Sequence, residues 1–166
     1  MTKERKNVIA KEEKKAIKIE RMAYTKDKIP SWFALLAIVA NVFFFVSIYK
    51  TNLKSYYTYT IGLSVLTNLL FMLAAFLCSE GVKAYKKGFG ITMIVLGAIE
   101  IGRIFFFPIK GINTIEPTTS LPVMGNGQFI SCVIFLSVAA AFLIAGGVIS
   151  IRNSMILKKS SKGKTR

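Results

Sequence analysis

The sequence predicts an all-α fold, a bundle of four transmembrane helices with both termini in the cytoplasm. Three observations lead to this prediction: four long apolar runs, a hydrophobic share of 53% in 166 residues, and an uneven distribution of basic residues. An ordinary soluble domain is less apolar, and the segments outside the runs are too short and too charged to bury a core. We therefore expect one membrane domain, residues 32–151, between two polar tails.

The four apolar runs cover residues 32–49, 60–78, 89–107 and 129–151 and contain 18, 19, 19 and 23 residues. At a rise of about 1.5 Å per residue, each run covers most or all of a hydrocarbon core about 30 Å thick. Backbone amides have no water partner in such a core, so each run should be a helix that bonds its own amides.

The first 31 residues form a tail of mixed charge, with ten basic and five acidic side chains. Its sparse apolar positions recur at helical spacing and favour a surface helix. Two interpretations stay open, a solvated helix that touches anionic lipid headgroups and a docking helix for a cytoplasmic partner. Pro30 should end this helix near Ile29, and the first membrane helix should begin after it.

The basic residues indicate the orientation of the spans. Ten precede Trp32, six follow Ile151 and three lie in the connection 79–88, whereas the other two connections hold Lys50, Lys54 and Lys110. By the positive-inside rule, the tails 1–31 and 152–166 and the connection 79–88 are cytoplasmic. Because the net charge of +15 is concentrated in these segments, it favours anionic lipid headgroups as partners and argues against nucleic acid.

The connection 108–128 is 21 residues long and contains Pro108, Pro117 and Pro122. Together with its glycines, these prolines predict an irregular loop without a persistent helix or strand. Its apolar residues indicate that the loop folds back over the bundle or rests against a neighbouring protein.

Glu100 and Arg103 are the only acidic or basic side chains within the four runs. Their spacing of three residues places them on one helix face, where they can pair. Counted along their helices, polar residues of the first and second runs reach a similar depth, so we expect one intramembrane polar cluster. Its predicted members are Asn41, Ser64, Asn68, Glu100 and Arg103.

Three interpretations of this cluster stay open. Polar side chains act as glue between membrane helices, so the cluster can be a structural network. An intramembrane acid is also a hypothesis for a functional site, here a proton or cation relay with Glu100 as the carrier. Finally, the charged pair can meet the membrane helix of a partner.

Small residues predict where the helices pack closely, because they let backbones approach. On the third and fourth runs these residues are Gly90, Gly97, Ser137, Ala141, Ala145 and Gly146, with Ala98 and Gly102 as a further pair. The third and fourth helices should therefore pack tightly. The phenylalanines at 43–45 and 105–107 are too bulky for such contacts, and we expect them mainly to face lipid or another subunit.

The composition argues against catalysis. The chain has no His, and its only Asp is Asp27 in the tail, so metal sites built on His or on paired Asp cannot form. A nucleophile would lack its base, and no nucleotide-binding motif is present. We expect no enzyme activity, cofactor or metal.

The leading hypothesis is a small protein of the plasma membrane of a bacterium, an accessory or assembly subunit of a larger membrane complex such as a transporter. Its expected partners are the lipid bilayer and another membrane protein or a second copy of itself. The alternative is a small oligomeric transporter or channel that uses Glu100 as an ion or proton site.

Overall fold

The computed structural model describes residues 13–14, 17, 25–49, 58–115, 120, 122 and 124–163. Its long helices are α2 (Lys28–Tyr49), α3 (Thr58–Lys83), α4 (Lys87–Phe106) and α6 (Asn126–Gly163), and a short helix, α5 (Pro108–Asn113), follows α4. Four of the helical segments are long and apolar enough to cross a membrane. The prediction of an all-helical chain with four such helices is confirmed for the described residues.

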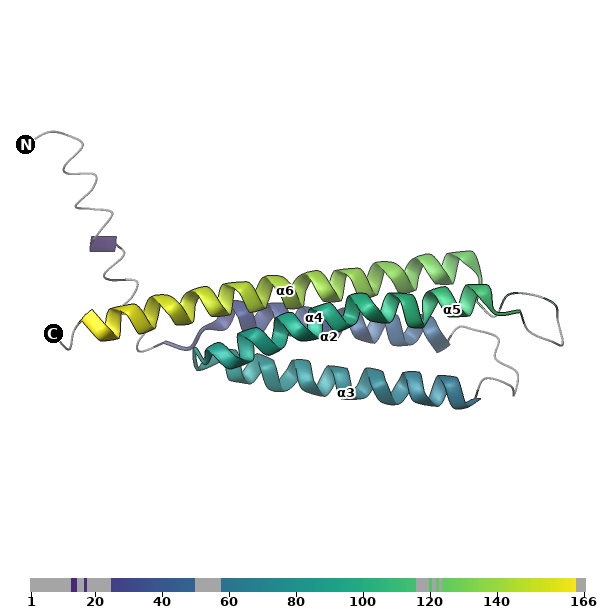
Figure 1. Ribbon diagram of the computed structural model, residues 1–166, viewed down its shortest axis with the longest axis horizontal. Coiled ribbons are helices and arrows are strands. Elements are labelled where there is room, and N and C mark those ends of the chain that lie inside the picture. Colours follow the sequence, from purple (N-terminus) through teal and green to yellow (C-terminus); the bar gives the residue numbers. More distant parts are fainter. Residues whose placement is uncertain are drawn as a thin grey trace, which may run out of the picture.

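The four long helices run alternately up and down along one axis (Figure 1), and their contacts form a ring. Helix α6 packs along both α2 and α4, α2 also packs on α3, and a thinner contact between α3 and α4 closes the ring. The start of α2, the turn from α3 to α4 and the end of α6 lie at one end, which we call the tail end. The opposite end, which carries α5, is called the loop end.

Several helix boundaries differ from the predicted ones. Helix α2 already begins at Lys28 and includes Pro30 in its first turn, where a missing N–H costs no helical hydrogen bond. Helix α3 continues five residues beyond the predicted end at Cys78, so the turn to α4 is only three residues long. Helix α6 continues to Gly163, well into the segment that was predicted as a tail.

The prediction of an irregular loop over residues 108–128 is wrong at its start. Pro108 occupies the first turn of α5, a position that tolerates a residue without an N–H. An isolated antiparallel bridge joins Ile115 to Pro122. Met124 donates its backbone N–H to the carbonyl of Gly111 over 3.2 Å and buries its side chain in the bundle, so this part of the connection does fold back over the loop end.

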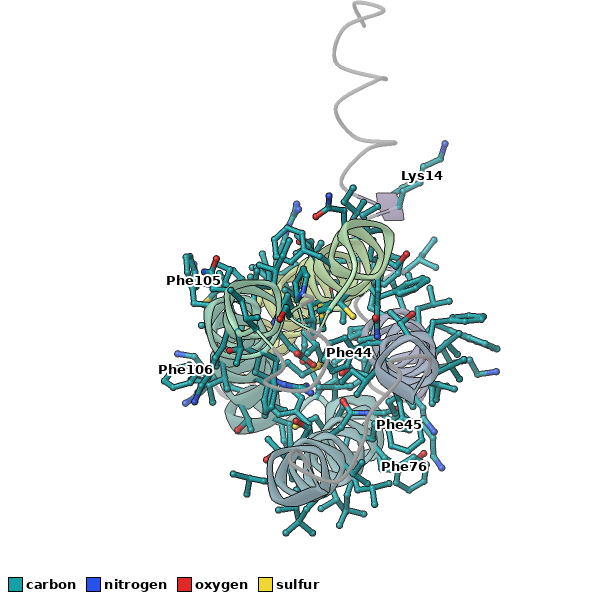
Figure 2. All side chains as sticks on the ribbon, turned by 90° about the vertical axis from the view of Figure 1, so that its right-hand side faces the viewer. Lys14, Phe44, Phe45, Phe76, Phe105 and Phe106 are labelled. Atoms are coloured by element: carbon teal, nitrogen blue, oxygen red, sulfur yellow. The ribbon has the colours of Figure 1, made fainter. Side chains whose placement is uncertain are left out.

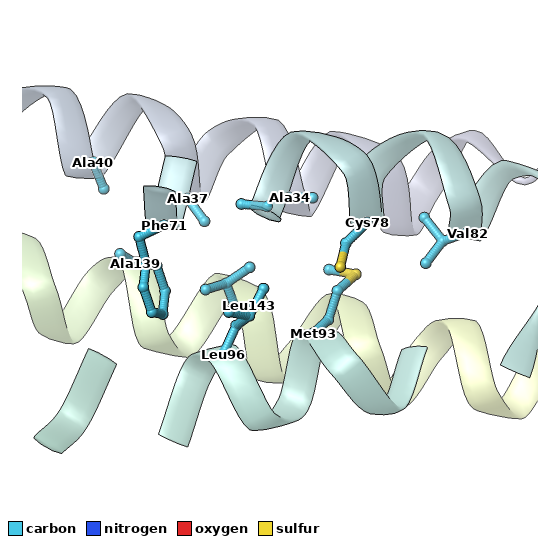
Figure 3. Close-up of a cluster of buried hydrophobic side chains, with 11 residues drawn as sticks. Ala34, Ala37, Ala40, Phe71, Cys78, Val82, Met93, Leu96, Ala139 and Leu143 are labelled. Carbon is cyan, nitrogen blue, oxygen red and sulfur yellow. The ribbon is translucent and has the colours of Figure 1, made fainter. Parts of the chain in front are cut away.

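Two clusters of buried apolar side chains fill the bundle. The first, toward the tail end, contains alanines of α2, Phe71 of α3 and side chains of α4 and α6 on the other side (Figure 3). The second, at the loop end, contains Phe44, Cys132, Leu136 and Met124. Phe44 therefore does not face outward, whereas Phe105 and Phe106 lie on the outside of the ring (Figure 2).

Helices α4 and α6 approach each other through glycines. A Cβ atom added at Gly97 would lie 3.1 Å from the backbone oxygen of Ala140, and one at Gly147 would lie 2.7 Å from that of Gly90. A Cβ atom added at Gly146 would lie 2.7 Å from Met93 Cε of α4 and 2.8 Å from Phe33 Cβ of α2. A side chain at Gly147 would therefore force the two backbones apart, and one at Gly97 would require its neighbours to shift.

The small residues predicted for this seam are only partly the ones found there. Gly90, Gly97 and Gly146 are buried, but Ser137 and Ala141 are exposed and Ala145 is half-buried. Ala98 and Gly102 are exposed as well. The buried face of α6 contains Ala139, Ala140, Leu143 and Gly147. The stripe chosen on α6 was wrong because several small-residue patterns with a spacing of four coexist on this helix, and spacing alone does not say which one faces α4.

Candidate functional site

A layer of polar side chains crosses the bundle between its two apolar clusters. Asn41 of α2, Asn68 of α3, and Glu100 and Arg103 of α4 are each no more than 5% exposed. Along α2, Asn41 stands between Ala40 of one apolar cluster and Phe44 of the other. The charged groups are therefore enclosed by apolar side chains on both sides, where electrostatic interactions are strong and poorly screened.

Arg103 is the hydrogen-bond donor at the centre of this layer. Its Nη1 donates to Glu100 Oε2 over 2.9 Å and to Asn41 Oδ1 over 3.2 Å. Its Nη2 donates to Asn68 Oδ1 over 2.9 Å. One planar guanidinium group thus joins α2, α3 and α4, which a lysine ammonium could not do with the same fixed geometry.

The two asparagines are held in place by further bonds. Asn41 donates its side-chain amide to the carbonyl of Ala37 over 3.1 Å, one turn back along α2. Asn68 donates across the interface to the backbone oxygen of Asn41 over 3.4 Å. Each asparagine therefore presents its Oδ1 atom, the acceptor, to Arg103.

Two phenylalanines complete the surroundings of Arg103. The guanidinium carbon lies 5.0 Å from the ring centroid of Phe44 and 5.2 Å from that of Phe71, within the range of cation–π attraction. Neither role was predicted from the sequence. A signal was present, since each Phe follows one of the asparagines by three residues and so lies on the same helix face.

Ser64, the fifth predicted member, lies one turn before Asn68 on the same face of α3. It is buried as well. Hydrogen bonds join the other four predicted residues, and the rings of Phe44 and Phe71 add to them.

The layer leaves two buried polar atoms without a hydrogen-bond partner in the described part of the chain. These atoms are Oε1 of Glu100 and Nε of Arg103. An unpaired buried group costs about 1–3 kcal/mol, and more when it carries charge. Arg103 therefore donates three hydrogen bonds and Glu100 accepts one through Oε2, but one further polar atom of each side chain has no partner.

A second set of polar contacts, which was not predicted from the sequence, joins three segments at the tail end. Asp27 donates its backbone N–H to the carbonyl of Lys83 over 3.1 Å and accepts a bond from Asn153 Nδ2 over 2.7 Å. Ser154 Oγ donates to the backbone oxygen of Tyr85 over 2.7 Å. The pKa of the Tyr85 phenol is raised above its ordinary value, because burial and the nearby Asp27 carboxylate outweigh the opposite effect of a hydrogen bond with Thr25.

No protein-family model, curated protein or solved structure gives a significant match to this chain. Three features of the described residues bear on function: the buried polar layer, the exposed apolar surface and the distribution of charge.

Proposed function

We propose that this chain is a multi-pass protein of a bacterial plasma membrane, with four spans and both termini in the cytoplasm. The four long apolar helices support the placement in a membrane. The exposed lysines of the turn between α3 and α4 and of the end of α6 lie at the tail end, whereas α5 contributes Lys110 at the loop end. The positive-inside rule assigns the more basic end to the cytoplasm.

Within that membrane, the proposed role is non-catalytic, as an accessory or assembly subunit of a larger membrane complex such as a transporter. The observation that carries this proposal is the bonding of Arg103, which uses the charged groups of the spans to join three helices of the same chain. A buried polar network of this kind specifies one helix arrangement. The chain thereby holds a fixed outer surface that a partner can recognise.

Part of that surface is aromatic. Phe105 and Phe106, near the loop end of α4, are 65% and 74% exposed. Because they lie beside α5, a partner helix would contact these two large side chains together with the edge that α5 forms. In the proposed complex, this face of α4 contacts the partner.

We expect purification in mild detergent to recover a second membrane protein in stoichiometric amount, identified by mass spectrometry. The double substitution Phe105→Ala and Phe106→Ala should lower that recovery severalfold. The matched control is Leu70→Ala with Leu73→Ala on α3, two side chains that are 58% and 56% exposed. Recovery of this chain alone would contradict the accessory role, and equal losses in both variants would contradict the assignment of the face.

A second candidate function, an oligomeric transporter or channel, is supported by the unpaired Oε1 of Glu100. A buried carboxylate oxygen without a donor is where a proton or a cation would bind. In proteoliposomes, Glu100→Gln should then abolish a pH-dependent flux, because the amide keeps the shape of the carboxyl but cannot exchange a proton. A flux that persists unchanged in this variant removes Glu100 from any transport mechanism.

A further inference from the structure

The tail end of the bundle presents a group of exposed basic side chains from three separate segments. We call this group the basic platform, and it consists of Lys28, Lys86, Lys87, Arg152, Lys158 and Lys159. The first belongs to α2, the next two to the turn and start of α4, and the last three to α6. No two of these segments are adjacent in the sequence, so the fold itself gathers the charges.

The acidic residues described at this end do not neutralise the platform. Glu80 forms an ion pair with Lys83, which is not a member of the platform. Asp27 is buried and accepts a hydrogen bond from Asn153. Within the described residues, no salt bridge reaches any of the six basic side chains.

The platform is held on a connected frame. The bond from Asp27 to Lys83 ties the start of α2 to the end of α3, and the bond from Ser154 to Tyr85 ties α6 to the turn. Lys158 follows Ser154 by one helical turn and so lies on the face of α6 that is turned toward Lys86 and Lys87. The charges therefore lie on segments that hydrogen bonds tie to one another.

An aromatic side chain stands beside the platform on the side of the apolar helices. Trp32 is 62% exposed and follows Lys28 by one turn of α2. Tryptophan beside lysine at the end of an apolar helix is typical of the boundary between headgroups and hydrocarbon. The basic side chains thus lie where the phosphate groups of lipids would be.

We propose that the basic platform binds the phosphate headgroups of anionic phospholipids. Ammonium and guanidinium groups donate charge-assisted hydrogen bonds to phosphate oxygens, and an anionic leaflet attracts each added cation. This inference rests on the proposed placement in a membrane, but it does not require a protein partner. If no protein partner is found, the lipid-binding inference is unaffected, and if no lipid binding is found, the accessory role is unaffected.

The test is native mass spectrometry of the whole chain in mild detergent with added phosphatidylglycerol or phosphatidylcholine. We expect retained adducts of phosphatidylglycerol in clear excess over those of phosphatidylcholine. The triple substitution Lys86→Gln, Lys87→Gln and Lys158→Gln should weaken phosphatidylglycerol binding on the order of a hundredfold. The matching substitutions to Arg, which keep the charge, should preserve it.

The control removes three charges elsewhere, by Lys50→Gln, Lys54→Gln and Lys110→Gln, and should leave phosphatidylglycerol binding unchanged. Circular dichroism on every variant separates lost binding from lost folding, and the Arg variant supports the proposal through retained binding if the Gln variant does not fold. Equal binding of the two lipids by the unsubstituted chain would overturn the proposal. The proposal would also be overturned if the chain showed no lipid preference but co-purified with an acidic protein, and if the triple Gln variant no longer bound that protein.

Discussion

Replacing Arg103 by Met should lower the free energy of unfolding by about 3–5 kcal/mol, the range for removal of one partner of a buried ion pair. The substitution leaves the Glu100 carboxylate, which is 0% exposed, without its donor. It also removes the donor that Asn41 and Asn68 share. Reversible unfolding in mixed micelles with increasing denaturing detergent, followed by circular dichroism, measures the loss.

The double variant Glu100→Met with Arg103→Met tests the cause. With both charges removed, no uncompensated charge is buried, and the stability should return to within about 1–2 kcal/mol of the unsubstituted chain. Arg103→Lys should fall between the two, because it keeps the charge but cannot reproduce the planar set of bonds. A double variant as unstable as Arg103→Met would show that the pair is not the source of the effect.

The polar layer was predictable from the sequence to an unusual extent. In apolar helices of known length, the position of a polar residue along the chain translates directly into depth, so Asn41, Asn68, Glu100 and Arg103 could be placed at one level. Depth alone does not predict how each helix is rotated about its axis, and so does not predict which of its faces turns inward. Phe44 shows the limit, because it was expected to face outward with its neighbours, and only its spacing of three residues from the buried Asn41 indicates the inward face.

The unpredicted features share a second cause, which is contact between segments far apart in the sequence. Asp27 and Asn153 form a hydrogen bond although 126 residues separate them. Neither residue belongs to a local pattern, and no periodicity relates the segments. The same holds for the face of α6, which was assigned to Ser137, Ala141 and Ala145 although its partner glycines on α4, Gly90 and Gly97, were chosen correctly as buried residues.

We expect Gly147→Ala to be destabilising by about 1–3 kcal/mol, the usual range for overpacking a well-packed contact. The added Cβ would lie 2.7 Å from the backbone oxygen of Gly90 and 2.7 Å from Cγ1 of Ile94. A backbone oxygen within a helix cannot move aside as the end of a side chain can, so α4 and α6 would have to separate. The measurement is the same unfolding titration in mixed micelles.

Gly102→Ala is the matched control, since it makes the same chemical change on α4 where no atom lies within 4 Å of the added Cβ. Because alanine favours a helix over glycine, this variant should be neutral or more stable by up to about 1 kcal/mol. Gly97→Ala should be intermediate, because the Cβ would meet Cγ1 of Ile144 at 2.6 Å, which can shift, and the backbone oxygen of Ala140 only at 3.1 Å. The expected order of stability is therefore Gly102→Ala, then Gly97→Ala, then Gly147→Ala. The reverse order would mean that close backbone approach does not hold α4 against α6.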